Sequence, residues 1–541
     1  MNAARRDEIL INEISRAFTR TVAETNGINI VDTLELLCKA PEVKNSLKVI
    51  NLVSEFRQLI LEYQFGTVSI ETLLEHQVST AIESFFSGFP LKYHEEHIHL
   101  TGSLTADFLF EGFQDVLSGE HGEAYQQRID DIFGPQEITS AQELDQLIRL
   151  RDDDLFDRYL RVLELPAMVL KDGEAHRKAA YHMARTLYTH YNVGNLKLKF
   201  TFARVAADPR IKVTPSREVV QGLFEGFNSF KQEVGDFDFS LSPSFRKEAS
   251  YFDKSRFGSK KEAFDQSVTD LLALIDEHPE LAANLNEVDT VGNERNLFRK
   301  DHFRDMQPGF RRLQRRGFQI RSHHGEVWKT LSKGIQAVDN AMNIWDIDNL
   351  EHGLSLGINP NYYFHSLYQR VSDNNEKSIA LTEGTRDYDE ISDMVWKHDS
   401  EVPELLIQGK PLTVSQQTAF SKAKFRTALE IERYQHDVLN RMIHKNISLV
   451  ALPSSNKKLT ENFVDYKDHP FSWWEKKGLR LGVGTDNYVT LNTHFIREML
   501  ILLYTDSENL KITKLLMMTT KENRRPMLSD LLWHMVLRDS D

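Results

Sequence analysis

Eight short apolar segments, separated by long helical stretches, are the feature that most restricts the fold of this chain. Each segment has the length of a buried strand, and the stretches between them are long enough for helices. The segments lie near residues 97–100, 196–202, 236–241, 283–290, 317–323, 347–351, 447–453 and 479–485. Strands that alternate with helices form a parallel sheet, so eight of them predict an α/β protein with a (β/α)8 barrel of the TIM type.

The chain is longer than such a barrel requires. A (β/α)8 barrel takes roughly 250 residues, whereas this chain has 541. We therefore expect an N-terminal helical extension over residues 1–90 and a barrel over 91–541, with a helical insertion at about 358–446 between the sixth and seventh strands. Apolar residues at helical spacing predict one long amphipathic helix in the insertion: Phe425, Leu429, Tyr434, Val438 and Met442. Either addition could contact a second copy of the chain or a partner protein.

The composition of the chain argues against several classes of protein. The chain has 66 basic and 80 acidic residues, a net charge of −14, which argues against a broad nucleic-acid surface but not against a small anionic substrate. The single cysteine, Cys38, excludes a disulfide framework and a cysteine-built zinc site. No segment has the apolar length of a membrane span, and the first residues lack the apolar centre of a signal peptide. We therefore expect a cytoplasmic protein that does not associate with membranes.

One local basic cluster stands out on this acidic chain. It comprises Arg311, Arg312, Arg315 and Arg316. A run of like charges is usually a solvated helix face, and we expect that role here rather than ligand binding.

Histidine and aspartate residues recur at the predicted ends of the strands. His97 and His99 project to one face because side chains alternate along a strand. His323, His352 and Asp486 end three further strands, and the carboxyl ends of barrel strands surround the active-site mouth. Three histidines and an aspartate suit zinc or a similar divalent ion, with one position left for water. Such an ion lowers the pKa of bound water and supplies hydroxide near neutral pH.

With further short motifs, the sequence resembles the adenosine deaminase family of the amidohydrolase superfamily. The motifs are EEHIHLTGSL at 95–104, VDTVGNE at 288–294, RSHHGE at 321–326, EHG at 351–353, LPSSN at 452–456 and GVGTDN at 482–487, with His469-Pro470 before the last strand. The resemblance covers about residues 91–520 without most of the insertion. It implies hydrolytic deamination of the adenine ring of a nucleoside or nucleoside 5′-monophosphate, namely adenosine, deoxyadenosine, AMP or dAMP. The products would be the hypoxanthine compound and ammonia, and the nucleophile a metal-bound hydroxide.

The resemblance also implies a role for each matching residue. One divalent ion, for which Zn²⁺ is best suited, would be held by His97, His99, His323 and Asp486. Glu326 would carry the proton given to N1 of the purine as C6 is attacked, and His352 would orient the hydroxide and stabilise its charge. The backbone N–H of Gly292 would meet N3. A carboxyl group that donates at neutral pH needs a raised pKa, which a closed apolar pocket supplies.

Two positions depart from the family's pattern. Thr101 replaces the aspartate that contacts the ribose 5′-hydroxyl; a carboxylate would repel a 5′-phosphate, whereas a hydroxyl can donate to one. This favours AMP or dAMP; the alternative is that Thr101 bonds the same 5′-hydroxyl. Asn487 replaces a second aspartate facing N7, which an amide N–H can bond directly. Lys197 or Lys199 could also meet a phosphate.

Two alternatives stay open. Another amidohydrolase could cleave an amide or deaminate a different base, which the Glu326 and Gly292 motifs disfavour. A non-catalytic scaffold or regulatory subunit could use the same barrel, since fold does not imply function. Retention of every metal ligand favours an enzyme, whereas the cytidine-deaminase type needs paired cysteine ligands that this chain lacks.

Overall fold

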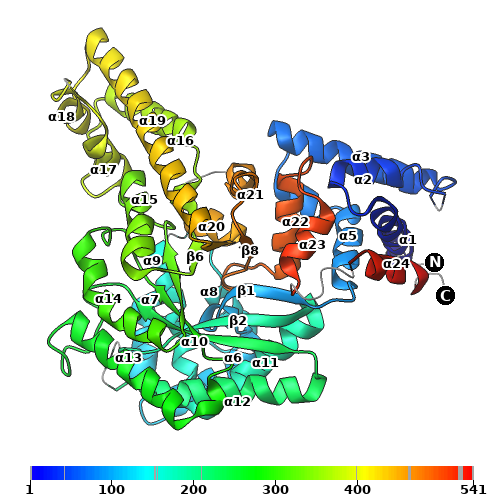
Figure 1. The fold of residues 1–541 in the computed structure, drawn as a ribbon, viewed down its shortest axis with the longest axis horizontal. Helices are drawn as coiled ribbons and strands as arrows, with labels where there is room; N and C mark the ends of the chain where they lie inside the picture. The colour runs from blue at the N-terminus through cyan, green and yellow to red at the C-terminus, as the bar shows by residue number, and fades with distance from the viewer. Residues whose placement is uncertain are drawn as a thin grey trace.

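The structure, a computed structural model, describes all residues except 1–2, 42, 152–153, 155, 207, 209, 398, 461–464, 522–527 and 539–541. Eight parallel strands form one sheet in the order β1 to β8 (Figure 1). They are β1 (Tyr93–His99), β2 (Val193–Thr201), β3 (Asp238–Arg246), β4 (Glu287–Val291), β5 (Gln319–His324), β6 (Asn349–His352), β7 (Ser448–Ala451) and β8 (Leu481–Val483).

Asp486, just after β8, closes the sheet into a barrel. The N–H of His99 donates to the carbonyl oxygen of Asp486 at 2.8 Å, and the N–H of Asp486 donates to that of His97 at 3.0 Å. Each of the eight predicted segments overlaps one strand. The predicted (β/α)8 barrel is therefore confirmed.

Helices connect the strands and cover the outside of the barrel. They are α6 (Ala106–Ser118), α7 (Gly122–Phe133), α8 (Ala141–Ile148), α9 (Phe156–Val162), α10 (Glu164–Val169), α11 (Gly173–Tyr191), α12 (Ser216–Val234), α13 (Lys260–Glu277), α14 (Lys300–Arg315), α15 (Leu331–Asn340), α20 (Pro453–Leu459) and α21 (Phe471–Lys476). Short turns are the 3₁₀ helices η1 (Thr101–Ser103), η2 (Pro279–Leu281), η4 (Leu354–Leu356) and η5 (Tyr466–Asp468) and the π-helix η3 (Ala341–Trp345). Gly222 and Gly226 allow α11 and α12 to pack closely, because a Cβ at either would overlap the backbone of α11.

The first five helices pack with the last helices of the chain rather than standing apart. They are α1 (Ala3–Thr25), α2 (Ile30–Leu37), α3 (Leu47–Phe65), α4 (Ile70–Leu74) and α5 (Gln77–Ser87), and they meet α22 (Phe495–Thr505), α23 (Ile512–Thr519) and α24 (Leu528–Arg538) (Figure 1). The Gln64 amide donates to the carbonyl oxygen of Tyr504 at 2.9 Å, and the Tyr504 and Ser79 hydroxyls lie 2.8 Å apart. Both ends of the chain thus build one helical layer.

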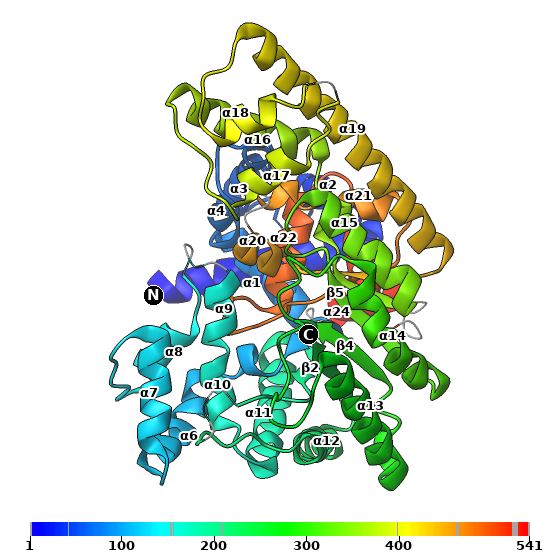
Figure 2. The same cartoon turned by 90° about the vertical axis from the view of Figure 1, so that its left-hand side faces the viewer.

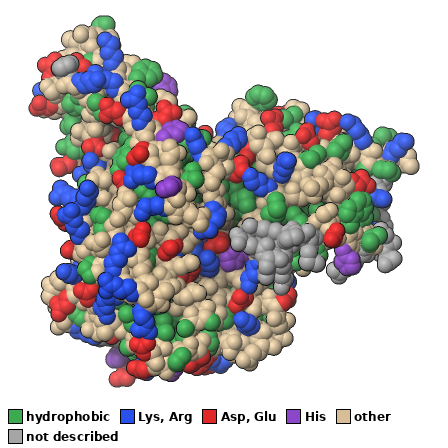
Figure 3. Space-filling model, viewed as in Figure 1, with side chains coloured by type: hydrophobic (Ala, Val, Ile, Leu, Met, Phe, Trp, Pro, Cys, Tyr) green, Lys and Arg blue, Asp and Glu red, His purple; other side chains and the backbone are tan. Residues whose placement is uncertain are grey.

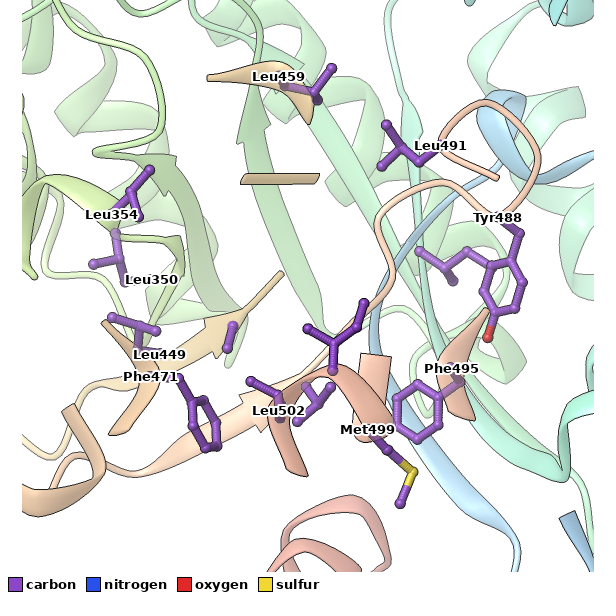
Figure 4. Close-up of a cluster of buried hydrophobic side chains, with 14 of the residues drawn as sticks. Leu350, Leu354, Leu449, Leu459, Phe471, Tyr488, Leu491, Phe495, Met499 and Leu502 are labelled. Atoms are coloured by element: carbon purple, nitrogen blue, oxygen red, sulfur yellow. The ribbon is translucent and has the colours of Figure 1, made fainter. Parts of the chain in front are cut away.

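This layer shares its core with the barrel. Leu350 of β6, Leu449 of β7 and Phe495, Met499 and Leu502 of α22 are all buried (Figure 4). Full burial of such a side chain is worth about 1.5–3 kcal/mol. The strands that carry the candidate site are therefore fixed from behind by apolar packing.

The segment between β6 and β7 forms a helical arm. It contains α16 (Pro360–Glu376), α17 (Arg386–Asp393), α18 (Val402–Ile407) and α19 (Val414–His444), and it projects from the barrel (Figures 1 and 2). The Gln435 amide fastens α19 to the barrel, donating to the carbonyl oxygens of Ser355 and Ile358 at 2.9 Å each. The predicted amphipathic helix is present, but Phe425 and Leu429 are 60% and 46% exposed because they lie on the other face of α19 from its buried residues, such as Ala428 and Ile431.

Charges of both signs intermix on the surface. On the face shown in Figure 3, basic and acidic side chains alternate over most elements. In the basic cluster, Arg311 pairs with Asp346 at 3.2 Å, and Arg316, at the end of α14, pairs with Asp276 of α13. Among the helices that the structure describes, none is both long and apolar enough to cross a membrane.

Candidate metal centre and active site

The residues expected to hold a metal meet at the carboxyl ends of the barrel strands. His97 and His99 lie at the end of β1, His323 in β5, and Asp486 just past β8. His352, the last residue of β6, lies beside them, its ring centroid 5.2 Å from that of His323. The structure therefore brings together side chains that are up to 389 positions apart (97 to 486) in the sequence.

Two of these residues adopt a backbone conformation that residues other than glycine rarely adopt. The φ angles of His352 and Asp486 are +65° and +68°. Such a conformation costs on the order of 1–3 kcal/mol and persists only where the surroundings impose it. At Asp486 the surroundings are the two hydrogen bonds to β1 that close the barrel.

Three imidazole nitrogens form a nearly equilateral triangle. The Nε2 atoms of His97 and His99 are 3.1 Å apart, and each lies 3.2 Å from Nε2 of His323. The Oδ1 of Asp486 is 3.4 Å from Nε2 of His99 and 3.7 Å from that of His97. All four side chains are at least four-fifths buried.

Carboxylates behind the histidines determine which nitrogens face the triangle. The Nδ1 of His97 lies 2.7 Å from Oε2 of Glu351, and the Nδ1 of His323 lies 3.0 Å from Oδ2 of Asp289. A carboxylate only accepts, so each Nδ1 carries its proton and each Nε2 presents a lone pair. Lone pairs facing one another at 3.2 Å repel unless a cation lies between them.

The donor set fits a metal ion. Three nitrogens at about 2.0–2.1 Å from one ion, in a near-tetrahedral arrangement, would have mutual separations like those observed. Burial lowers the pKa of His99 to about 3 and lowers that of His323 well below its ordinary value, so both rings are the neutral form that binds a metal. The residues therefore fit one divalent metal ion, and Zn²⁺ suits this nitrogen-rich set.

Lys199 stabilises the carboxylates that orient the histidines. Its Nζ lies 2.9 Å from Oδ2 of Asp289 and 3.0 Å from Oε1 of Glu351, and all three side chains are fully buried. Lys197, two residues earlier, faces the opposite end of the barrel, where it pairs with Glu96 at 3.0 Å. The structure thus gives neither lysine to a phosphate, because both are already held by carboxylates.

Glu326 lies in the same cavity on the turn after β5. Its backbone N–H donates to Oε1 of Glu294 at 2.8 Å, and that of Val327 donates to the same oxygen at 3.1 Å, which fixes the turn. Burial, reinforced by the charges of Asp486 and Glu294, raises the pKa of Glu326 to about 7. The group can therefore be a proton donor near neutral pH, as the sequence-based argument requires.

His352 is held by a relay of two further side chains. Its Nδ1 is 2.8 Å from Oδ1 of Asn456, and the Asn456 Nδ2 is 3.0 Å from Nε2 of His469. Although burial opposes it, the charges of Glu326 and Asp486 raise the pKa of His352. This contact explains why the LPSSN and His-Pro motifs accompany the histidine motifs. Spacing alone did not indicate the relay.

One cavity of about 460 Å³ contains these groups. Its walls include His99, His323, Asp486, Glu326, His352, Thr101 and Gly292. Gly292 has φ of +100°, and a Cβ there would overlap the Glu248 carboxylate, so the turn after β4 requires glycine. The volume lies within the roughly 300–1,000 Å³ typical of small-molecule sites.

His97 does not line this cavity; it is fully buried, with its Nε2 close to those of His99 and His323. Asn487 does not reach the cavity either. Its amide donates to the Tyr159 hydroxyl and to Oδ1 of Asp486, each at 2.6 Å, and its side chain is fully buried. The side chain packs beneath η1, where a Cβ at Gly102 would overlap it. Tyr159, which does line the cavity, lies on the cavity side of the amide. In this structure the Asn487 amide thus contacts two residues of the cavity wall, Tyr159 and Asp486, and does not itself line the cavity.

Comparison with known proteins identifies a shared fold. No protein-family model and no curated protein matches the sequence. Among solved structures, the ADAL–IMP complex aligns with a TM-score of 0.50 at 14% identity, over 84% of this chain and 99% of that one. An adenine deaminase from Arthrobacter aurescens has a TM-score of 0.48 at 12% identity, over 82% of this chain and 99% of its own. The apo N6-methyl-AMP deaminase from Arabidopsis thaliana aligns with a TM-score of 0.48 at 14% identity, over 84% of this chain and 98% of that one. The chain thus shares the barrel fold of the ADAL structure.

Proposed function

We propose that this chain is a metal-dependent hydrolase of the adenosine deaminase family that deaminates the adenine ring of a nucleoside or nucleotide. The substrates that the sequence favours are adenosine, deoxyadenosine, AMP and dAMP. One observation carries the proposal: three imidazole nitrogens and the Asp486 carboxylate converge next to the protonatable Glu326 in one cavity. The ADAL structure of the same fold contains IMP, which is the product expected from AMP.

We give each residue the role that the family resemblance implies, and the positions of the side chains in the cavity support it. A divalent ion held by His97, His99, His323 and Asp486 would lower the pKa of a water molecule and so supply the nucleophile near neutral pH. Glu326 donates a proton to N1 of the purine, which removes the aromatic resistance to attack at C6. Water contributes its oxygen to C6, and one of its protons returns to Glu326. The C6–N bond breaks, and the amino group leaves as ammonia with the second proton of the water.

The remaining residues orient the reactants. The Nδ1 of His352 is bonded to Asn456, so its Nε2 is the nitrogen available to align the attacking water. Gly292 places its backbone N–H where N3 of the purine can accept from it. The Thr101 hydroxyl contacts the 5′ end of the sugar, as a donor to either a hydroxyl or a phosphate oxygen.

An ultraviolet assay for conversion of adenine to hypoxanthine tests the proposal. Zinc-loaded protein is incubated with adenosine, deoxyadenosine, AMP, dAMP and ATP, alongside Glu326→Ala and Glu383→Ala, a change on the exposed surface of the arm. We expect turnover of at least one adenine compound, a loss of about 10²–10⁴-fold in Glu326→Ala, and no change in Glu383→Ala. Zinc-bound wild type that turns over none of the five would refute the proposal and favour a non-catalytic role.

A further inference from the structure

Five cationic side chains besides the buried Lys199 line the catalytic cavity. Arg128 belongs to α7, Arg161 to α9, Arg204 and Lys212 to the segment between β2 and α12, and Arg246 to the end of β3. The carboxylates in the cavity wall are Glu326 and Asp486 at the metal end, and Glu164 among the cations. A chain with a net charge of −14 thus concentrates positive charge at its candidate site.

Carboxylates hold two of these cations in place. The Nε of Arg128 donates to Oε2 of Glu164 at 2.8 Å, and the Nε of Arg246 donates to Oε2 of Glu248 at 3.0 Å. A guanidinium fixed in this way has its remaining N–H groups pre-oriented for a ligand.

Backbone carbonyls, which carry no net charge, hold two of the others. Arg161 donates to the carbonyl oxygen of Asp131 at 2.7 Å, and Arg204 donates to that of Ala167 at 3.1 Å. Within the described part of the chain, no carboxylate lies within ion-pair distance of Arg161, Arg204 or Lys212. Burial lowers the pKa of Arg204, and the nearby charge of Glu164 offsets this effect only in part. An anionic ligand would compensate it.

The number of cations indicates the kind of anion. A single phosphate carries about two negative charges near neutral pH, and one or two basic groups suffice to bind it. Here three cations without a carboxylate partner and two ion-paired arginines face the same cavity. Guanidinium groups bind phosphate oxygens in pairs. A chain of phosphates matches this arrangement better than a single one.

We propose that Arg128, Arg161, Arg204, Lys212 and Arg246 form a polyphosphate subsite, and that the preferred substrate is an adenine nucleoside 5′-polyphosphate such as ATP or dATP. This inference rests on the proposed deaminase function, because it assumes that the adenine ring lies at the metal end. The phosphate chain extends from the 5′ carbon past Thr101 towards the five cations. No phosphate bond is broken, and the reaction is the same exchange of the amino group for oxygen.

The test compares substrates and variants. We measure kcat/KM for adenosine, AMP and ATP in wild type, Arg204→Met, Arg204→Lys and Lys212→Met. Arg210→Met is the matched control, because Arg210 lies in the same segment but is paired with Asp208 at 2.6 Å and is not part of the cavity wall.

The subsite predicts a specific pattern of results. Wild type prefers ATP over AMP by about tenfold or more, the effect of one charge-assisted hydrogen bond. Arg204→Met lowers kcat/KM for ATP by about ten- to hundredfold and leaves adenosine unchanged; Arg204→Lys restores part of the loss. The subsite would be refuted if wild type had an equal or higher kcat/KM for AMP than for ATP, or if Arg204→Met lowered kcat/KM equally for adenosine and ATP. Neither result would refute the proposed deaminase activity.

A binding measurement separates failure of the subsite from failure of the proposed function. Inorganic tripolyphosphate and inorganic phosphate are each added to zinc-loaded protein, and the midpoint of thermal unfolding is recorded. We expect tripolyphosphate to raise the midpoint more than phosphate in wild type and Arg210→Met, but not in Arg204→Met. If this holds while no adenine compound is deaminated, only the function is wrong. If tripolyphosphate has no effect beyond that of phosphate, the subsite is wrong.

Discussion

The Nδ1 of His97 lies 2.7 Å from Oε2 of Glu351, and this hydrogen bond determines which nitrogen His97 presents to the metal site. Glu351 precedes His352 in the sequence and is itself held by Lys199 and Arg321. A carboxylate behind a metal-ligating histidine fixes the ring and increases its basicity.

We therefore expect Glu351→Gln to weaken zinc binding by about 10–100-fold, as loss of such a carboxylate does. Competition with a chelator of known affinity measures the change. Glu287→Gln is the matched control, because Glu287 is also buried and pairs with Arg321 but does not contact a metal-ligating histidine. Equal zinc affinity in Glu351→Gln and wild type would show that the contact has no role in metal binding.

The relay from His352 through Asn456 to His469 makes a second prediction. Asn456→Ala leaves the metal ligands intact but frees the His352 ring, so kcat falls by about ten- to hundredfold while KM and zinc affinity stay unchanged. Steady-state kinetics combined with zinc titration test this split. A fall in activity that only follows a loss of zinc would assign Asn456 a purely structural role.

Glu390, in the helical arm, predicts a pH-dependent stability. Its Oε1 accepts from the Tyr363 hydroxyl and the Leu331 N–H, each at 2.7 Å, and burial raises its pKa to about 7. The native state therefore holds a proton that the unfolded state releases near pH 4.5. The contribution of the Glu390 carboxyl to the free energy of unfolding is fully present at low pH. It is lost as the pH rises through 7, which lowers the free energy of unfolding by up to about 3 kcal/mol.

Glu390→Gln mimics the protonated carboxyl and removes this dependence. Relative to wild type, the variant should unfold at a similar temperature at about pH 5 and at a higher temperature at about pH 9. Thermal unfolding followed by circular dichroism at both pH values provides the measurement, with the exposed Glu383→Gln as control. If the unfolding temperatures of Glu390→Gln and wild type differed by the same amount at both pH values, Glu390 would not be the source of the pH dependence.

Some of this structure follows directly from sequence pattern. Strand segments and their order predict the barrel, because periodicity and alternation are local properties. Side chains at strand ends, such as His323 and Asp486, can be placed in one site because parallel strands end on the same face.

Other features depend on contacts that no local pattern contains. Lys199 was a candidate for a phosphate, but only the folded barrel shows that Asp289 and Glu351 surround it. Asn487 directly follows Asp486, yet the positive φ of Asp486 directs the next side chain beneath η1. The cavity arginines, such as Arg204, come from segments with no distinguishing motif. They meet only through the packing of α7, α9 and the segment after β2.

The central claim is that one metal ion at the histidine triangle makes this chain an adenine deaminase. The most direct measurement removes metal with a chelator and titrates Zn²⁺ back while ammonia release from adenine nucleosides and nucleotides is followed. We expect no activity without metal, a linear rise in activity as Zn²⁺ is added, and a plateau at one equivalent per chain, with no rise in a variant carrying His97→Ala. Activity that survives metal removal, or zinc bound at one equivalent with no ammonia released from any adenine compound, would contradict it.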